Sequence, residues 1–285
     1  MAKLFVTGAG EYVCAFFVER ALRKCHQVTL IHATATPVPS DVNFQVRDAA
    51  KASDYSELLR DHNAIIHLDA RPEACAGIIA AARNTGVKRI LYLSRLGARP
   101  QCPVTSFATH FKNEQALQAS GLDVSIFKPA PIYGPKELRF TELVNWLRRF
   151  PFIPYVQGWG MLQPVDVYDL VAFMLATVEN SETIGHRFEI GGTERVSMGQ
   201  LIDVLIELQG GRTIKWAWFT NYAQWLTRRV GRLPFPFWRD IDDVLMHNEQ
   251  LICNMRGLPY QFKIQLSPMR EGLKQYYFNS TEKSN

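Results

Sequence analysis

Four polar side chains in the middle of the chain have types and spacing that could serve proton transfer. Ser94 follows a short apolar run, and Ser106, His110 and Lys112 lie on one predicted helix. Ser106 and His110 are four residues apart, so their side chains share a helix face and could hydrogen-bond. A serine–histidine pair without an orienting acid or a nucleophile turn gives poor support for hydrolysis. These four residues are therefore candidates for catalysis, but they do not form a complete catalytic site.

A glycine turn near the N-terminus is the candidate anion site. The apolar run Leu4 to Val6 leads into Thr7-Gly8-Ala9-Gly10, and an apolar helical pattern follows. A dinucleotide-binding half-domain begins in this way, because free N–H groups at the helix N-terminus bind a pyrophosphate. The glycine pattern is incomplete in both frames. Glu11 and Cys14 stand three and six residues after Gly8, and Val13 takes the third place of G-x-G-x-x-G.

Glu11 and Cys14 each have two interpretations. A carboxylate at a helix N-terminus gains roughly 0.3–1 kcal/mol from the helix dipole, so Glu11 could compete with a phosphate. Alternatively, Gly10 provides the close backbone approach and Glu11 points to solvent. A thiol near a helix N-terminus can be activated, but Cys14 in place of a glycine is better explained as a small packing residue.

The composition is that of a folded protein with one large or two small domains. The chain has 285 residues, 47% of them hydrophobic and 21% charged, with a net charge of +5. Without a block of five lysines or arginines, nucleic-acid binding is not indicated. The five cysteines show no metal spacing, so we expect reduced thiols and no metal site. Without an apolar run of about 18 residues or a signal-peptide pattern, we expect a cytoplasmic or organelle-matrix location, with a peripheral membrane association left open.

The elements that would position these side chains alternate between strands and helices. We expect strands at 4–6, 27–32, 44–48, 64–69, 88–94, 124–129 and 188–192, and helices after the glycine turn and at 53–60, 72–84 and 106–120. This alternation predicts an α/β fold with a doubly wound parallel Rossmann sheet. The segment Pro129 to Pro135 should be a rigid loop, neither helix nor interior strand, because proline has no N–H.

The remainder predicts a smaller, mostly helical C-terminal lobe. We place the Rossmann core at 1–135, completed by about 160–192, and the lobe at 136–159 and 193–285. Helical patterns cover 136–149, 197–209, 220–231, 240–254 and 267–277, and 163–172 reads as a strand that turns into a helix.

Seven motifs in this order resemble the short-chain dehydrogenase/reductase superfamily. They are Thr7-Gly-Ala-Gly, Asp48, Ser94, Ser120 to Pro129, Ile132-Tyr-Gly-Pro, Gln163 to Asp169 and Phe188-Glu-Ile-Gly-Gly. The resemblance is greatest to its atypical and extended branches: epimerase-like proteins, NmrA-like proteins and the NADPH-binding accessory subunit of respiratory complex I. It implies an NAD(P) site formed by Gly8, Ala9, Gly10, Glu11, Tyr12, Val13, His32, Asp48, Ala49, Leu68, Asp69, Ala70, Ser94, Pro129 and Ile132.

The second strand bears on the choice of dinucleotide. NAD sites place an acid at its end to hold the ribose hydroxyls, whereas here the strand ends His32-Ala33-Thr34. We therefore favour NADP(H), with weak or absent binding as the other outcome.

The superfamily's catalytic couple is missing. A Tyr-x-x-x-Lys pair precedes the sixth strand in the family, where the lysine lowers the tyrosine pKa. Counting back from Ser120 puts His110 at the lysine position and Ser106 at the tyrosine position, and taking Lys112 as the lysine gives Ala108 as its partner. We expect a binding, assembly or regulatory protein with weak or no catalysis. The alternative is an NADP(H)-dependent reductase, or an epimerase- or dehydratase-like enzyme, with a non-standard proton donor.

The C-terminal third is rich in aromatic residues and arginine. It contains Trp216, Trp218, Phe219, Tyr222, Trp225, Phe235, Phe237 and Trp238, and an arginine-bearing segment at 225–233. Three interpretations remain: the core and lid of a second lobe, a docking surface for a protein complex or membrane, or a pocket for a large apolar ligand.

Overall fold

The computed structural model describes residues 1–32, 43–46, 53–211, 213–233, 235, 239–255 and 257–279. By their contacts they form two compact units. The first contains Met1–Pro100, Phe107–Pro129 and Leu170–Glu189, and the second contains Gln101–Ser106, Ala130–Asp169 and Ile190–Asn285. The domain boundaries expected from the sequence stay a prediction.

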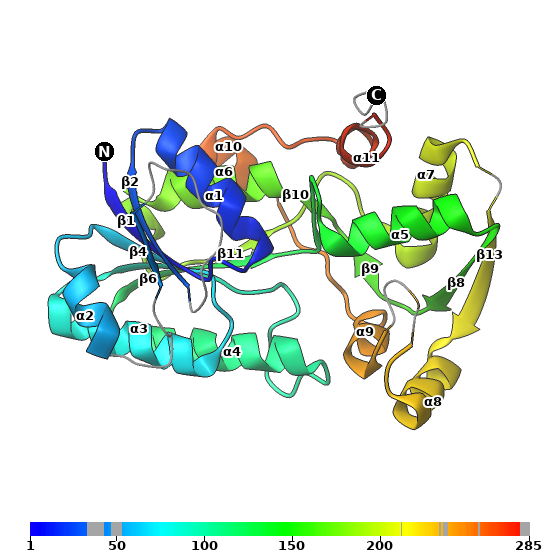
Figure 1. Ribbon diagram of the computed structural model, residues 1–285, viewed down its shortest axis with the longest axis horizontal. Helices are drawn as coiled ribbons and strands as arrows, with labels where there is room; N and C mark the ends of the chain where they lie inside the picture. The colour runs from blue at the N-terminus through cyan, green and yellow to red at the C-terminus, as the bar shows by residue number, and fades with distance from the viewer. Residues whose placement is uncertain are drawn as a thin grey trace. The chain divides into compact units, whose positions relative to one another are not determined.

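A seven-stranded sheet forms the centre of the first unit, in the order β11-β6-β5-β4-β1-β2-β3 (Figure 1). The strands are β1 (Lys3–Thr7), β2 (Gln27–His32), β3 (Asn43–Val46), β4 (Ala64–His67), β5 (Arg89–Leu93), β6 (Asp123–Pro129) and β11 (Arg187–Ile190). Pairing is parallel from β3 through to β6. Parallel strands covered on both faces are apolar throughout, and accordingly Leu4, Phe5 and Val6 are fully buried. The predicted doubly wound sheet is confirmed.

Helices cover both faces of this sheet. They are α1 (Tyr12–Arg23), α2 (Ser53–Leu59), α3 (Pro72–Thr85), α4 (Thr105–Gln118) and α6 (Val167–Thr177). Figure 1 shows α1 and α6 on one face and α2, α3 and α4 on the other. Gly86 ends α3 in the left-handed conformation at φ 77°, where a glycine has no Cβ to clash. The chain then continues into β5, which pairs with β4, and from β5 to α4.

The second unit combines helices with three two-stranded sheets. The helices are α5 (Leu138–Arg149), α7 (Met198–Gln209), α8 (Thr220–Val230), α9 (Ile241–Met246), α10 (Leu258–Phe262) and α11 (Met269–Tyr277). The paired strands are β7 (Ile132–Tyr133) with β10 (Val165–Asp166), β9 (Met161–Leu162) with β12 (Val196–Ser197), and β8 (Phe152–Gln157) with β13 (Ile214–Phe219).

Asp166 and Asp169 fasten the C-terminal segment of the second unit. The hydroxyl of Tyr276 donates to Asp166 Oδ2 over 2.8 Å, and the backbone N–H of Ser267 donates to Asp169 Oδ2 over 2.7 Å. The hydroxyl of Tyr277 donates to the carbonyl of Gly134 over 2.6 Å. The acidic residues of the 163–169 motif therefore organise the fold of this unit.

Two sequence expectations about the second unit are wrong. The helix expected at 240–254 ends at Met246, because the chain beyond it pairs with the 160–163 segment: Leu251 N donates to Met161 O and Gln163 N to Leu251 O. The loop expected at 129–135 contains β7, because Ile132 and Tyr133 lie between the prolines and pair with β10. None of the described helices is both long and apolar enough to cross a bilayer.

Candidate functional site

The glycine turn packs tightly against the end of β4. Gly8 has φ +85°, a conformation that side-chain-bearing residues rarely adopt. A Cβ added at Gly8 would lie 2.9 Å from Asp69 N and 3.0 Å from Leu68 C. The turn closes through a 2.9 Å hydrogen bond from Glu11 N to Gly8 O. Gly8 thus allows β1 to turn directly over the β4 terminus, and Gly10 is exposed.

Glu11 occupies the N-cap position of α1 without capping it. Its backbone is extended, and its side chain makes no hydrogen bond to the first turn. Burial raises the pKa of Glu11, Arg95 and Arg71 act to lower that pKa, and Asp69 acts to raise it. The Glu11 side chain is therefore half-buried among mixed charges, and both sequence interpretations, a competitor for the anion site or a side chain that points to solvent, stay predictions.

Asp69, directly beyond β4, is held by Arg71. Asp69 Oδ2 accepts from Arg71 Nη2 over 2.6 Å, and Oδ1 accepts from Arg71 Nε over 3.0 Å and from its backbone N–H over 2.9 Å. Burial alone would raise the pKa of Asp69, but the hydrogen bonds and charge of Arg71 outweigh it and lower that pKa. Asp69 is therefore an ionised carboxylate with a fixed orientation.

A chain of buried polar rings joins β4, β5 and α4. The buried His67 hydrogen-bonds through Nδ1 to Thr7 Oγ1 over 2.7 Å, and its ring stacks on Tyr92 with centroids 5.5 Å apart. Asn113 Nδ2 donates to the Tyr92 hydroxyl over 3.1 Å, and that hydroxyl lies 2.9 Å from His110 Nδ1. The phenolic oxygen therefore accepts from Asn113 and shares a second hydrogen bond with His110 Nδ1, whose direction depends on the histidine tautomer.

Burial keeps both imidazoles of this chain neutral. It lowers the pKa of His67 to about 4 and that of His110 to about 3. The nearby cations Arg95 and Lys128 act in the same direction on the pKa of His110. Burial also raises the pKa of Tyr92. The phenol and the two imidazoles are therefore uncharged at neutral pH.

Ser94 belongs to a second buried network. Its hydroxyl donates to Glu114 Oε1 over 2.5 Å. Lys128 Nζ lies 3.4 Å from the same oxygen and donates to the carbonyl of Ala98 over 2.7 Å. Glu114 is fully buried, and the Lys128 side chain is 10% exposed. The buried carboxyl group of Glu114 thus orients the Ser94 hydroxyl, and Glu114 is in turn paired with Lys128.

The other catalytic candidates are not brought together. Ser106 is exposed, and its backbone N–H donates to Asp242 Oδ2 over 3.3 Å. The expected bond from Ser106 to His110 is replaced by the one from Tyr92. Lys112 is exposed on α4. Burial raises the pKa of Cys14 to about 12, which agrees with a packing role.

The remaining cofactor candidates are distributed over both units. In the first unit, Leu68 and Pro129 are buried, Val13 is buried at the start of α1, and the Tyr12 ring lies 5.1 Å from that of Phe16. Ala9 and Ala70 are partly exposed there, as is Ile132 in the second unit. His32 ends β2, although its side chain lies outside the described residues, as do Asp48 and Ala49. No metal-binding cluster occurs in the described part of the chain.

Sequence reasoning missed the residues that hold these side chains in place. They are Arg71, Tyr92, Asn113, Glu114 and Lys128. One signal was available: Glu114 follows His110 by four residues, so both face β5 from one side of α4. Lys128, by contrast, lies on β6, the strand that follows α4, and sequence spacing alone does not bring its side chain back to Glu114.

Comparisons with known proteins agree with this architecture. Residues 8–141 match a family model described as NAD(P)H-binding. The chain is 24% identical over 169 residues to NADH dehydrogenase [ubiquinone] 1 alpha subcomplex subunit 9, mitochondrial, of Rattus norvegicus, covering 59% of this chain and 45% of the relative. The Dictyostelium discoideum protein of the same name is 23% identical over 49% of this chain and 38% of its own length. The chain thus spans less than half the length of these curated relatives.

Solved structures share the fold over nearly the whole chain. A nucleoside-diphosphate-sugar epimerase from Staphylococcus aureus superposes with a TM-score of 0.80 at 15% identity, covering 95% of this chain and 99% of its own. The UDP-glucose 4-epimerase of Thermotoga maritima, solved with UDP-glucose, gives 0.75 at 15% identity over 98% and 99%. At these identities the likeness establishes the fold alone.

The strand order, the glycine turn and the matched family model define an NAD(P)-binding Rossmann-type protein. With the two sets of relatives, they show a chain that is similar to the atypical part of the short-chain dehydrogenase/reductase superfamily and shares its fold with sugar-nucleotide epimerases.

Proposed function

We propose that this protein binds a dinucleotide but has little or no dehydrogenase activity, and that it acts in binding, assembly or regulation. One observation carries the proposal. At the position that the resemblance gives to the catalytic lysine stands His110, a buried imidazole with its pKa lowered to about 3 and its Nδ1 bonded to Tyr92. A neutral imidazole supplies no positive charge with which to lower the pKa of a nearby phenol.

Tyr92 does not take the place of the missing tyrosine. Its side chain is fully buried, and burial raises its pKa. A general acid or base must come within hydrogen-bond reach of the substrate and exchange its proton near the operating pH. The Tyr92 hydroxyl is already engaged by Asn113 and His110 and meets neither condition.

The glycine turn fits a dinucleotide. The Gly8 turn brings the start of α1 over the β4 terminus with no Cβ between them, and Glu11 leaves the helix N–H groups uncapped by its side chain. The turn at 8–13, the 68–70 segment, Ser94, Pro129 and Ile132 would hold the cofactor, together with His32, Asp48 and Ala49. NAD(P), when bound, supplies a hydride acceptor or donor. The absence of an acid in His32-Ala33-Thr34 favours NADP(H).

Titration of the purified chain with NADPH and NADH tests this site. We expect micromolar binding with a preference for NADPH. Replacing Glu11 by Gly or Gln removes a negative charge beside the phosphate position and should tighten binding about 3- to 10-fold, a gain of roughly 0.7–1.4 kcal/mol. Glu19→Gln, on the same helix, is the matched control and should leave the affinity unchanged. Absence of binding in the parent chain and in both Glu11 variants would contradict the nucleotide site.

The relatives suggest a setting for such a protein. The curated ones are named as subunits of a mitochondrial NADH dehydrogenase, so we propose assembly with a respiratory or other membrane-associated complex. The location would be an organelle matrix or the cytoplasm, at the periphery of a membrane. Blue-native electrophoresis of extracts, with and without detergent, should find the chain in a complex and not as a free monomer.

The second candidate is a reductase or epimerase-like enzyme with a non-standard proton donor. The Ser94–Glu114 hydrogen bond favours it, because a serine held by a buried acid is a polar group oriented at the end of β5. Incubation with NADPH or NAD⁺ and UDP-glucose distinguishes the two functions. Turnover that Ser94→Ala abolishes would replace the inactive interpretation.

A further inference from the structure

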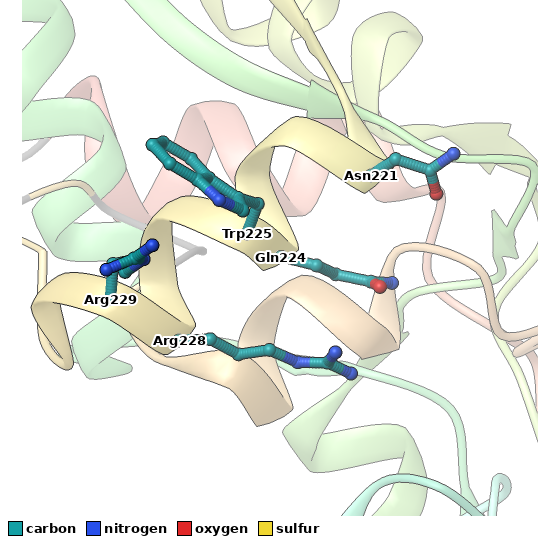
Figure 2. A pocket seen from close by; sticks show the side chains of 5 residues that line it. All are labelled: Asn221, Gln224, Trp225, Arg228 and Arg229. Atoms are coloured by element: carbon teal, nitrogen blue, oxygen red, sulfur yellow. The ribbon is translucent and has the colours of Figure 1, made fainter.

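The second unit carries an exposed surface of aromatic and arginine side chains on β13 and α8. We name it the aromatic–arginine face, and it comprises Trp216, Tyr222, Trp225, Arg228 and Arg229. The exposed fractions of its three rings are 58%, 50% and 52% in that order. Side chains of α8 line a shallow hollow of about 470 Å³ beside Trp225, at Asn221, Gln224, Trp225, Arg228 and Arg229. Figure 2 shows all five extending from this helix, with the arginines towards its C-terminal end.

The helix α8 has small residues on its buried side and large aromatic residues on its exposed side. It buries small residues, Ala223 and Thr227, and turns its large rings outwards. Tyr222 stacks on Trp225 with centroids 5.6 Å apart, and the Arg229 guanidinium lies 5.9 Å from the Trp225 ring centroid. Trp218 connects these two rings to Trp216, with centroids 5.1 Å from Tyr222 and 5.4 Å from Trp216. A contiguous group of exposed rings marks an interaction surface on soluble proteins. The mutual packing holds the rings in place before any partner arrives.

All charged residues in the sequence segment that carries this face are basic. Residues 208–239 contain six lysines and arginines and no aspartate or glutamate. Arg228 and Arg229 are exposed, and neither forms an ion pair within the described residues. Lys215 and Arg239 pair with Asp203 and Glu142, so the positive potential beside the exposed rings comes from Arg228 and Arg229.

The neighbouring helix α9 and its N-cap residue carry three aspartates, and these are engaged locally. Asp240 accepts from the backbone N–H of Asp243 at the start of α9, and Asp243 pairs with Arg139 over 2.9 Å. Asp242 accepts from the Thr105 hydroxyl over 3.1 Å. The carboxylates beside α8 thus have partners other than Arg228 and Arg229.

We propose that the aromatic–arginine face docks on the surface of a bilayer that contains anionic phospholipids. Indole and phenol rings have an apolar body and a polar edge, and they concentrate at the level of lipid headgroups. Guanidinium groups bind phosphates through paired hydrogen bonds. A protein partner would need an equally uniform acidic patch, whereas an anionic leaflet presents phosphates everywhere. None of the residues of this face belongs to the proposed nucleotide site, whose glycine turn lies in the first unit.

Co-sedimentation with vesicles tests the proposal. The full chain is mixed with vesicles of phosphatidylcholine alone or with 30% phosphatidylglycerol, in about 0.1 M salt, where charges beyond roughly 10 Å are screened. We expect sedimentation with the anionic vesicles only. Arg228→Glu/Arg229→Glu should lower the partition coefficient at least about 30-fold, because each basic residue near the surface contributes roughly 1 kcal/mol. Trp225→Ala should lower it several-fold.

The matched control is Lys24→Glu/Lys88→Glu, which makes the same change in net charge at two exposed lysines of the first unit. It should stay within about twofold of the parent chain. Circular dichroism checks that all variants are folded, and quenching of tryptophan fluorescence by brominated lipid gives an independent measure of contact. Failure of the parent chain to sediment, or an equal loss in both double variants, would overturn the proposal. Either result would leave an acidic protein partner as the occupant of this face.

Discussion

Replacing Lys128 by methionine removes the ammonium group that faces Glu114 and keeps most of the side-chain volume. Lys128 Nζ lies 3.4 Å from Glu114 Oε1, and the two side chains are 10% and 0% exposed. In the variant, Glu114 keeps the Ser94 hydroxyl as a donor but loses its charge partner, and the carbonyl of Ala98 loses the donor 2.7 Å away.

The expected loss follows from this geometry. Two unit charges 3.4 Å apart attract each other by about 5 kcal/mol at an effective dielectric constant of about 20. Part of this is offset because a buried pair has lost its hydration, and removing one partner of such a pair costs about 3–5 kcal/mol. We expect Lys128→Met to lower the free energy of unfolding by that amount. The melting temperature should fall by roughly 10 °C for a chain of this size.

Urea unfolding of a double-mutant cycle measures the coupling. Glu114→Gln alone leaves a buried ammonium, whereas the double variant removes both charges and keeps an acceptor for Ser94. The double variant should be at least about 2 kcal/mol more stable than the sum of the single losses predicts. The control is Lys112→Met. Lys112 is exposed on α4, the helix that carries Glu114, so this variant should change the free energy of unfolding by less than about 0.5 kcal/mol. A loss below about 1 kcal/mol for Lys128→Met, or additive losses, would refute the assignment of a buried ion pair.

Two further predictions concern acid stability and the glycine turn. The pKa is about 4 for His67 and about 3 for His110 in the fold, below the unfolded value of about 6.5. The unfolded chain therefore binds more protons, and stability should fall from pH 6.5 towards pH 4 by about 1.4 kcal/mol per pH unit for each histidine. Urea unfolding across this range should show a slope smaller by one such contribution in His110→Gln, and an unchanged slope would contradict the buried neutral imidazole. Gly8→Ala should lose about 1–3 kcal/mol, because its φ is +85° and its Cβ would lie 2.9 Å from Asp69 N. Gly10→Ala, at an exposed position, should change thermal unfolding little, and equal losses would argue against the close packing.

The sheet of the first unit could be predicted because its signals are local. Each central strand is a short apolar run followed by a helical pattern, and parallel order follows from that alternation. The weaker prediction was in the second unit. The strand at 214–219 pairs with the one at 152–157, about 60 residues earlier, and its exposed positions do not alternate with buried ones. Neither its existence nor its partner is visible in a short window.

Some residues of the candidate site could likewise be predicted from the sequence, and others could not. Gly8 and Ser94 could be found from motif position, since a turn glycine and a strand-end serine depend on neighbours in sequence. The roles of Tyr92 and Lys128 could not, because each depends on a contact with α4 that only the fold creates. Likewise, the sequence suggested that Ser106 and His110 pair on one helix face, but burial of His110 against Tyr92 determines its hydrogen bond.

The two buried networks also bear on the proposed lack of a Tyr–Lys couple, because a single substitution on α4 would not create one. A lysine at position 110 would place an ammonium among the cations that already act on His110, namely Arg95 and Lys128. It would also replace the His110 Nδ1 partner of the Tyr92 hydroxyl by an ammonium, which can only donate. The phenol required by the couple would have to stand at 106, where the side chain is exposed and the backbone is held by Asp242. The region between β5 and α4 is therefore organised around internal hydrogen bonds, and its polar side chains position the helix on the sheet.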